Sequence, residues 1–82
     1  MKRYNYISLF SGGGIGDIGF RKAGYTPIVM NELEENRAEI IKNNYSDSCV
    51  VVGDIATHLE EIYKQAIKKL NGERLFMLVA TP

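Results

Sequence analysis

Four short apolar runs separated by segments of helical spacing are the feature that most restricts how this sequence can fold. The runs lie at about residues 5–10, 26–31, 49–53 and 74–80. The third run, CVVVG, is apolar almost throughout, as expected for a strand that helices cover on both faces. Runs of this kind joined by helices indicate an α/β fold with βαβαβαβ order and a parallel sheet.

Three segments between these runs are predicted to be helices, at about residues 15–23, 34–45 and 57–70. The second carries a stripe of three apolar residues, Ala38, Ile41 and Tyr45. The third carries six apolar residues at the spacing of a buried helix face: Leu59, Ile62, Tyr63, Ala66, Ile67 and Leu70. Gly24 follows the first helix at the position of a left-handed C-terminal cap.

Right-handed crossovers limit how four such strands can be arranged. If the chain reverses direction after the third strand, the sheet order is 3-2-1-4 and a crevice lies above the first strand. The glycine-rich stretch, Glu32, Asp54 and Pro82 then fall at or just beyond the carboxyl ends of strands. Open α/β sheets bind their ligands at this edge.

The stretch LFSGGGIGDIGF, residues 9–20, places glycine at positions Gly12, Gly13, Gly14 and Gly16. Glycine costs conformational entropy, so such a cluster favours a ligand that lies against the backbone over a turn alone. Amide N–H groups at the start of the following helix could bind a carboxylate or a phosphate. A purely structural turn is the alternative.

Two acidic residues follow strand ends and complete the outline of a nucleoside site. Glu32 lies about 20 residues past the glycines, where a carboxylate can accept hydrogen bonds from both ribose hydroxyls. Asp54 could accept from the exocyclic amine of an adenine, with Ile55 as an apolar wall. Leu33 could pack on the opposite face of the ring, and Phe10 could line the same pocket.

Each of these positions also has a purely structural explanation. Glu32 could be a solvated acid that opens the second helix, and Asp54 could belong to an ordinary Gly-Asp turn. Phe10 could equally be a core residue at a strand end. Thr57 and Glu60 have the spacing of a capping box at the start of the third helix.

Composition argues against several classes of protein. Ten basic and ten acidic residues cancel, so net charge gives no electrostatic signature of nucleic-acid binding. The longest apolar run is too short to cross a membrane, and no secretory signal is recognisable. No metal-ligand spacing and no catalytic constellation around His58 are found. The single Cys49 is expected to be a small buried residue and fits a reducing cytosol.

These motifs resemble those of the DNA (cytosine-5) methyltransferases. ISLFSGGGIGDIGFRKAGY is similar to the first motif of that family, a strand with F-S-G-x-G and then a helix that ends in Ala-Gly. MNELEENRAEIIKNNY resembles the second motif and GDI the third. VATP resembles the approach to the fourth, where the family carries Pro-Cys with its catalytic thiol. The resemblance covers essentially all 82 residues.

The resemblance implies S-adenosylmethionine as cofactor and residues 1–82 as the N-terminal, cofactor-binding part of the catalytic domain. The expected fold is the first half of a Rossmann-like methyltransferase domain. By analogy, Glu32 binds the ribose hydroxyls and Asp54 the adenine amine. The residues implied around the cofactor are Phe10, Gly12, Gly13, Gly14, Asn31, Glu32, Leu33, Asp54 and Ile55.

Three positions depart from the family pattern. Many members have Asp where Ser8 stands and Gly where Ile15 stands, which bears on the local contacts of the loop. Leu33 is less aromatic than the stacking residue of some members, so adenine binding is expected to be modestly weaker.

The implied reaction is methyl transfer to C5 of cytosine in double-stranded DNA, after a cysteine thiolate attacks C6 of a flipped-out base. The family's cysteine, its assisting glutamate and its target-recognition region would lie beyond Pro82, so we expect the 82-residue chain to be inactive alone. The parent enzyme is expected in the cytoplasm, near the nucleoid of a prokaryote. The open edge of the last strand is expected to cause self-association.

Two other function classes remain as alternatives. An NAD- or FAD-binding half-domain of an oxidoreductase is supported by Glu32 and by the G-x-G-x-x-G match at Gly14, Gly16 and Gly19. The F-S-G-G-G lead-in and the GDI sequence argue against it. The other alternative is a non-catalytic module that binds adenosine.

Overall fold

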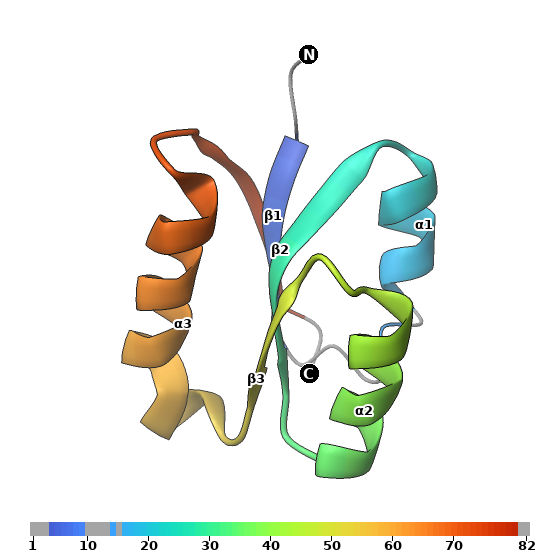
Figure 1. The fold of residues 1–82 in the computed structure, drawn as a ribbon, viewed down its shortest axis with the longest axis vertical. Coiled ribbons are helices and arrows are strands. Elements are labelled where there is room, and N and C mark those ends of the chain that lie inside the picture. The colour runs from blue at the N-terminus through green and yellow to red at the C-terminus, as the bar shows by residue number, and fades with distance from the viewer. Residues whose placement is uncertain (1–3, 10–13, 15, 81–82) are drawn as a thin grey trace.

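The chain folds into alternating strands and helices in a computed structural model that describes residues 4–9, 14 and 16–80. Phe10, Gly12, Gly13, Ile15 and Pro82, named above, lie outside the described residues. The elements are β1 (Tyr4–Leu9), α1 (Asp17–Lys22), β2 (Tyr25–Glu32), α2 (Glu35–Asn44), β3 (Cys49–Val52), α3 (Ile55–Leu70) and β4 (Leu75–Ala80) (Figure 1). The predicted βαβαβαβ order is confirmed.

The strands form one sheet in the order β3-β2-β1-β4, and all three neighbouring pairs are parallel. The predicted order 3-2-1-4 and the Rossmann-like α/β class are therefore confirmed. Because the strands are parallel, their carboxyl ends meet at one edge of the sheet, the lower edge in Figure 1. This edge carries the ends of β2 and β3, where the predicted nucleoside residues lie.

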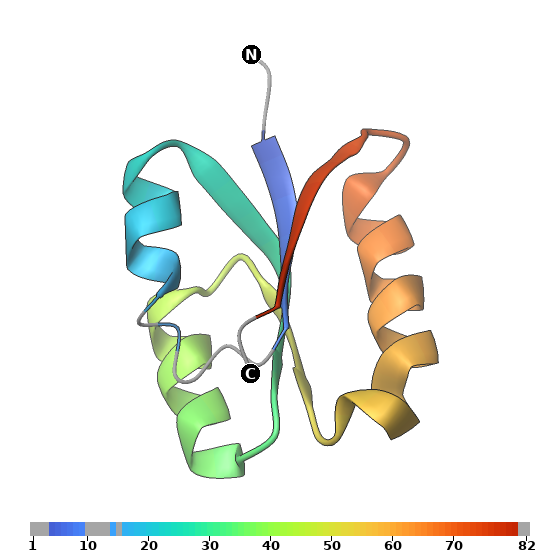
Figure 2. The same ribbon diagram turned by 180° about the vertical axis from the view of Figure 1, so that it is seen from behind.

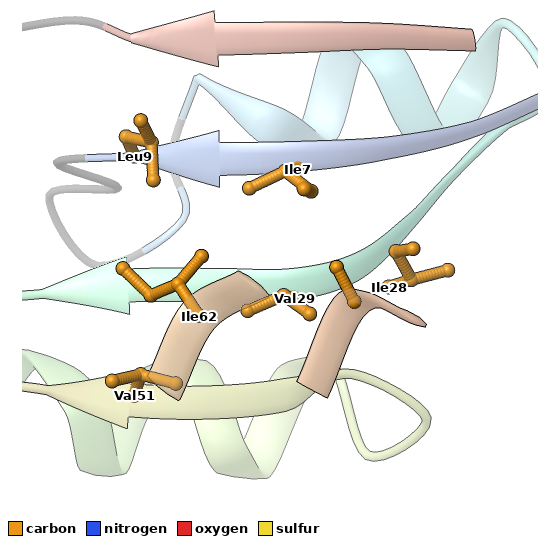
Figure 3. Packing of buried hydrophobic residues seen from close by; sticks show 7 residues of the cluster. Ile7, Leu9, Ile28, Val29, Val51 and Ile62 are labelled. Carbon is orange, nitrogen blue, oxygen red and sulfur yellow. The ribbon is translucent and has the colours of Figure 1, made fainter. Parts of the chain in front are cut away.

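Helices cover both faces of the sheet. α1 and α2 lie on one face and α3 lies alone on the other (Figures 1 and 2). Figure 3 shows the core beneath α3, where Ile62 lies over Val29 and Val51. On the opposite face, Ile41 and Tyr45 pack with Met30. Each such buried side chain contributes about 1.5–3 kcal/mol of hydrophobic stabilisation.

The first helix ends as the sequence predicts. α1 stops at Lys22, and Gly24 follows with a φ of +95°. This left-handed conformation favours glycine because it has no Cβ. It lets the chain turn directly into β2, which starts at Tyr25.

The predicted buried stripe of α3 is only partly correct. Ile62 and Ala66 are buried, but Leu59, Tyr63 and Ile67 are exposed. The reason is that α3 packs on β1, β2 and β3, so the part of the stripe that faces away from these strands has no described neighbour to cover it. The spacing of apolar residues shows which side chains lie on one face of a helix. How many of them are buried depends on how much of that face the strands cover.

Among the described residues, β4 is an edge strand, which agrees with the open edge expected from the sequence. β4 pairs with β1 on one side, and within the described part of the chain no strand lies on its other side. The described helices pack chiefly on β1, β2 and β3, so Leu75, Phe76 and Leu78 of β4 are exposed. An exposed apolar edge strand of this kind is a template for pairing with another chain.

We therefore expect the 82-residue chain to self-associate through β4. Leu78→Lys should weaken association by about tenfold or more, because it removes an apolar contact and places a charge at the edge. Light scattering across a dilution series measures the effect. Ile40→Lys is the matched control, since Ile40 on α2 is 50% exposed against 56% for Leu78. A wild-type chain that is monomeric at every concentration would contradict the expectation.

Candidate functional site

The predicted nucleoside residues that the structure describes gather at the carboxyl ends of β2 and β3. Glu32 is the last residue of β2 and pairs with Val52, the last residue of β3. One residue further, the Gly53 N–H donates to the Glu32 carbonyl at 2.9 Å. This bond extends the pairing past the strand end and brings Asp54 beside the β2 terminus.

Glu32 is the most deeply buried acid at this edge, with 3% of its surface exposed. Its Oε2 accepts a hydrogen bond from the Glu34 N–H at 2.9 Å, which fixes the carboxylate in the turn before α2. The alternative of a solvated acid is therefore wrong. Ionised carboxylates have about four acceptor positions, so this one retains capacity for ligand hydroxyls.

A buried carboxylate of this kind costs free energy unless a cation or several donors compensate it. In the part of the chain that the structure describes, the ion pairs are Arg37–Glu34 and Lys42–Glu39, on the surface of α2. Glu32 has no basic partner among those residues. Its position at the carboxyl end of a parallel strand makes Glu32 a candidate ligand-binding residue.

Asn31 supports the neighbouring turn. Its side chain is buried, and Nδ2 donates to the carbonyls of Val51 at 3.2 Å and Gly53 at 3.1 Å. Gly53 has a φ of +132°, and a Cβ there would lie 2.3 Å from the His58 ring. This backbone conformation and the His58 ring both favour glycine at this position, and the two Asn31 hydrogen bonds hold the turn that precedes Asp54. Contact of Asn31 with a cofactor stays a prediction.

Asp54 begins α3, which starts two residues earlier than the sequence spacing suggests. Its Oδ1 accepts from the Ala56 N–H at 2.8 Å, and Thr57 donates to its carbonyl at 3.1 Å. The predicted capping box of Thr57 and Glu60 is therefore wrong, because Asp54 already occupies the N-cap. The Asp54 side chain is exposed, so its carboxylate can cap the helix and still accept from a ligand amine.

Two apolar side chains flank these acids. Leu33 follows β2 and is 62% exposed, while Ile55 at the start of α3 is half-buried. An exposed apolar side chain beside convergent polar groups is typical of a small-molecule site. The predicted roles of both residues against an adenine ring stay predictions.

The glycine-rich stretch is described at Gly14 and Gly16. Gly14 has a φ of +82°, and a Cβ there would lie 2.6 Å from Cε2 of Tyr45. The Tyr45 hydroxyl donates to the Gly14 carbonyl at 2.8 Å. The Tyr45 ring therefore leaves no room for a side chain at position 14. The sequence did not suggest this contact. Around Gly16, no described atom lies within 4 Å of the Cβ position.

Asp17 is a buried residue of this region that sequence reasoning missed. Its carboxylate accepts from the Tyr6 hydroxyl at 2.5 Å and from Ser8 Oγ at 3.0 Å. Burial, and then the hydrogen bond to Asp17, raise the pKa of Tyr6, so its hydroxyl stays a donor. The sequence offered little signal for this contact, because Asp17 lies nine residues from Ser8 and eleven from Tyr6.

The family model described as C-5 cytosine-specific DNA methylase matches residues 4–80. The chain belongs to this family. The resemblance inferred from the sequence motifs is therefore confirmed.

Three curated relatives from bacteria illustrate the match. Type II methyltransferase M.AquIA of Picosynechococcus sp. is 37% identical over 76 residues, which cover 93% of this chain and 30% of the relative. M1.HgaI of Avibacterium volantium is 32% identical over 76 residues, which cover 93% and 21%. M.NgoPII of Neisseria gonorrhoeae is 36% identical over 66 residues, which cover 80% and 19%. The chain thus spans less than a third of the length of these relatives. No solved structure matches it.

The described residues contain neither a membrane-spanning helix nor a metal-binding cluster. None of the helices there has the length and apolar character needed to span a bilayer. No three His, Cys, Asp or Glu side chains among the same residues come together as a metal-binding group.

The contact between Gly14 and Tyr45 predicts how alanine substitutions differ along the glycine-rich stretch. Gly14→Ala should destabilise the chain by about 1–3 kcal/mol, because it combines an unfavourable φ with a clash against the ring. Gly19→Ala is the matched control, since no described atom lies within 4 Å of its Cβ position and it lies within α1.

The control should be neutral or stabilising by about 0.5–1 kcal/mol, as alanine is a better helix former. Thermal unfolding measures both variants. Equal midpoints for the two would show that the Tyr45 ring does not restrict position 14.

Proposed function

We propose that residues 1–82 bind S-adenosylmethionine as the cofactor-binding part of a DNA (cytosine-5-)-methyltransferase. The observation that carries the proposal is the buried carboxylate of Glu32 at the carboxyl end of β2. It lies beside the turn that presents Asp54, in a chain whose family methylates cytosine at C5. Two acids on adjacent strand ends match the two polar edges of an adenosine, its ribose and its base.

In this proposal, the adenosine half of the cofactor lies across the ends of β2 and β3. Glu32 accepts from the ribose hydroxyls, and Asp54 accepts from the adenine amine. Leu33 and Ile55 cover the two faces of the ring. Asn31 donates a hydrogen bond to the Gly53 carbonyl and so holds the turn that positions Asp54.

The methionine half of the cofactor lies along the glycine-rich stretch. Phe10, Gly12, Gly13 and Gly14 would surround it, with backbone N–H groups available to its carboxylate. When bound, the cofactor supplies a methyl group on a positively charged sulfur. The residues of this chain bind and orient it, so that the methyl group faces the second substrate.

In the whole enzyme, we propose that the acceptor is C5 of cytosine in double-stranded DNA. That substrate would place the enzyme in the cytoplasm, at the nucleoid of a prokaryote. Residues 1–82 alone should transfer no methyl group. Their single cysteine, Cys49, starts β3 at the edge opposite the site, and burial raises the pKa of its thiol. A raised pKa disfavours the thiolate that the family's mechanism requires.

The dinucleotide alternative is weakened by the surroundings of Gly16 and Gly19. In a G-x-G-x-x-G fingerprint the second glycine admits the pyrophosphate and the third allows close packing of helix on strand. No described atom lies within 4 Å of the Cβ position at Gly16 or Gly19. Gly19 therefore matches the fingerprint in its spacing, but it does not make the close helix–strand contact that the third glycine of the fingerprint allows.

Calorimetric titration of the 82-residue chain with S-adenosylhomocysteine and with NAD tests the proposal. S-adenosylhomocysteine should bind more tightly than NAD. Glu32→Gln should weaken its binding by about 10- to 100-fold, because a hydrogen bond to a charged group is lost. Asp54→Asn, which keeps a helix-capping side chain, should weaken it about tenfold.

Glu60→Gln provides the control, since it makes the same change on the exposed surface of α3. Circular dichroism shows whether each variant is folded. Tighter binding of NAD, or a Glu32→Gln variant with unchanged affinity, would contradict the proposal.

A further inference from the structure

Tyr45 connects the end of α2 to the glycine-rich stretch, although the two are 31 residues apart in sequence. The side chain is 4% exposed, and its hydroxyl donates to the Gly14 carbonyl in a buried hydrogen bond. The ring also occupies the space that a side chain at position 14 would need. Tyr45 therefore holds this part of the backbone by both shape and hydrogen bonding.

Arg21 fixes the ring of Tyr45 from α1. Its guanidinium carbon lies 4.3 Å from the ring centroid, in the arrangement of a cation–π contact. The same guanidinium donates to the Asn44 carbonyl at 2.6 Å, at the end of α2. Two contacts to adjacent residues of α2 leave the ring little freedom to turn away from Gly14.

Asp17 gives the same stretch a second anchor three residues further along. Its carboxylate is held by Tyr6 and Ser8, both in β1. The start of α1 is therefore tied to the strand that precedes the stretch, and Gly14 is tied to α2. Gly14 and Asp17 are therefore both held by buried side chains from distant parts of the chain.

The Tyr45 hydroxyl keeps the proton that it needs to donate a hydrogen bond. Burial raises the pKa of its hydroxyl, and the nearby Arg21 opposes that shift with a smaller effect. The hydroxyl thus stays protonated around neutral pH and can donate to the carbonyl. Phenylalanine would fill the same volume without this bond, so the hydroxyl has a role that packing alone does not require.

We propose that Tyr45 is a positioning residue for the part of the ligand that hangs from the ribose 5′ carbon. Because a peptide unit is planar, holding the Gly14 carbonyl fixes the orientation of that whole unit. Gly14 is then already held in place when the amino-acid portion of the ligand binds, so less ordering is needed at this residue. The inference rests on the proposed function, but the adenosine half is held by Glu32 and Asp54 and does not depend on Tyr45.

The test compares two ligands that differ by the amino-acid portion alone. Calorimetry with the 82-residue chain measures affinity for S-adenosylhomocysteine and for adenosine. Tyr45→Phe should lower the first by about three- to tenfold, the value of one hydrogen bond, and leave the second within about twofold. Tyr63→Phe is the matched control, because Tyr63 is 65% exposed on α3. It should change neither affinity.

A second variant covers the case in which Tyr45→Phe does not fold. Ser8→Ala removes one donor to Asp17 and leaves the Tyr45 ring untouched. It should show the same selective loss of S-adenosylhomocysteine affinity.

Equal losses for both ligands, or no loss for either, would overturn the inference while leaving the proposed function standing. A wild-type chain that binds neither ligand would overturn the proposed function, and the inference with it.

Discussion

The pairing of β2 with β3 at their carboxyl ends is the interaction on which the site depends. It sets Glu32 opposite Val52 and continues through the bond from the Gly53 N–H to the Glu32 carbonyl. The Asn31 side chain adds two bonds beside it, to the carbonyls of Val51 in β3 and of Gly53 just after β3. A register shift of one residue would turn Glu32 to the opposite face of the sheet and separate it from Asp54. The proposed nucleoside site therefore requires this register.

Two glycines, Gly14 and Gly53, have the same kind of surroundings. Gly14 and Gly53 both have a positive φ, and at both an aromatic ring of the chain lies where a Cβ would be. Tyr45 fills this role at Gly14 and His58 at Gly53. A glycine in such a position reports close packing by the protein as well as space for a ligand. Glycine spacing alone therefore could not identify the cofactor, and the proposal of S-adenosylmethionine rests on the strand-end acids together with the family.

Local sequence patterns were sufficient for the order of elements, since strand and helix spacings differ and each operates over a few residues. The sheet order followed from the handedness of crossovers and the assumption of one reversal. Burial was less predictable. The exposed side of α3 and the exposed β4 depend on which surfaces face them, and this is not encoded in the apolar spacing of either segment.

Contacts between distant residues account for what the sequence did not reveal. Nothing near Tyr45 in the sequence indicates that it binds Gly14, and nothing near Asp17 indicates that Tyr6 and Ser8 enclose it. The start of α3 was misplaced for a more local reason. Thr57 and Glu60 have capping-box spacing, but Asp54 provides a cap three residues earlier, directly at the end of the β3 turn.

The most direct measurement is a crystal structure of the 82-residue chain grown with S-adenosylhomocysteine. The account predicts ligand density over the ends of β2 and β3, with ribose oxygens at the carboxylate of Glu32 and the adenine between Leu33 and Ile55. Density at any other edge or face, with Glu32 still enclosed and unliganded, would contradict it.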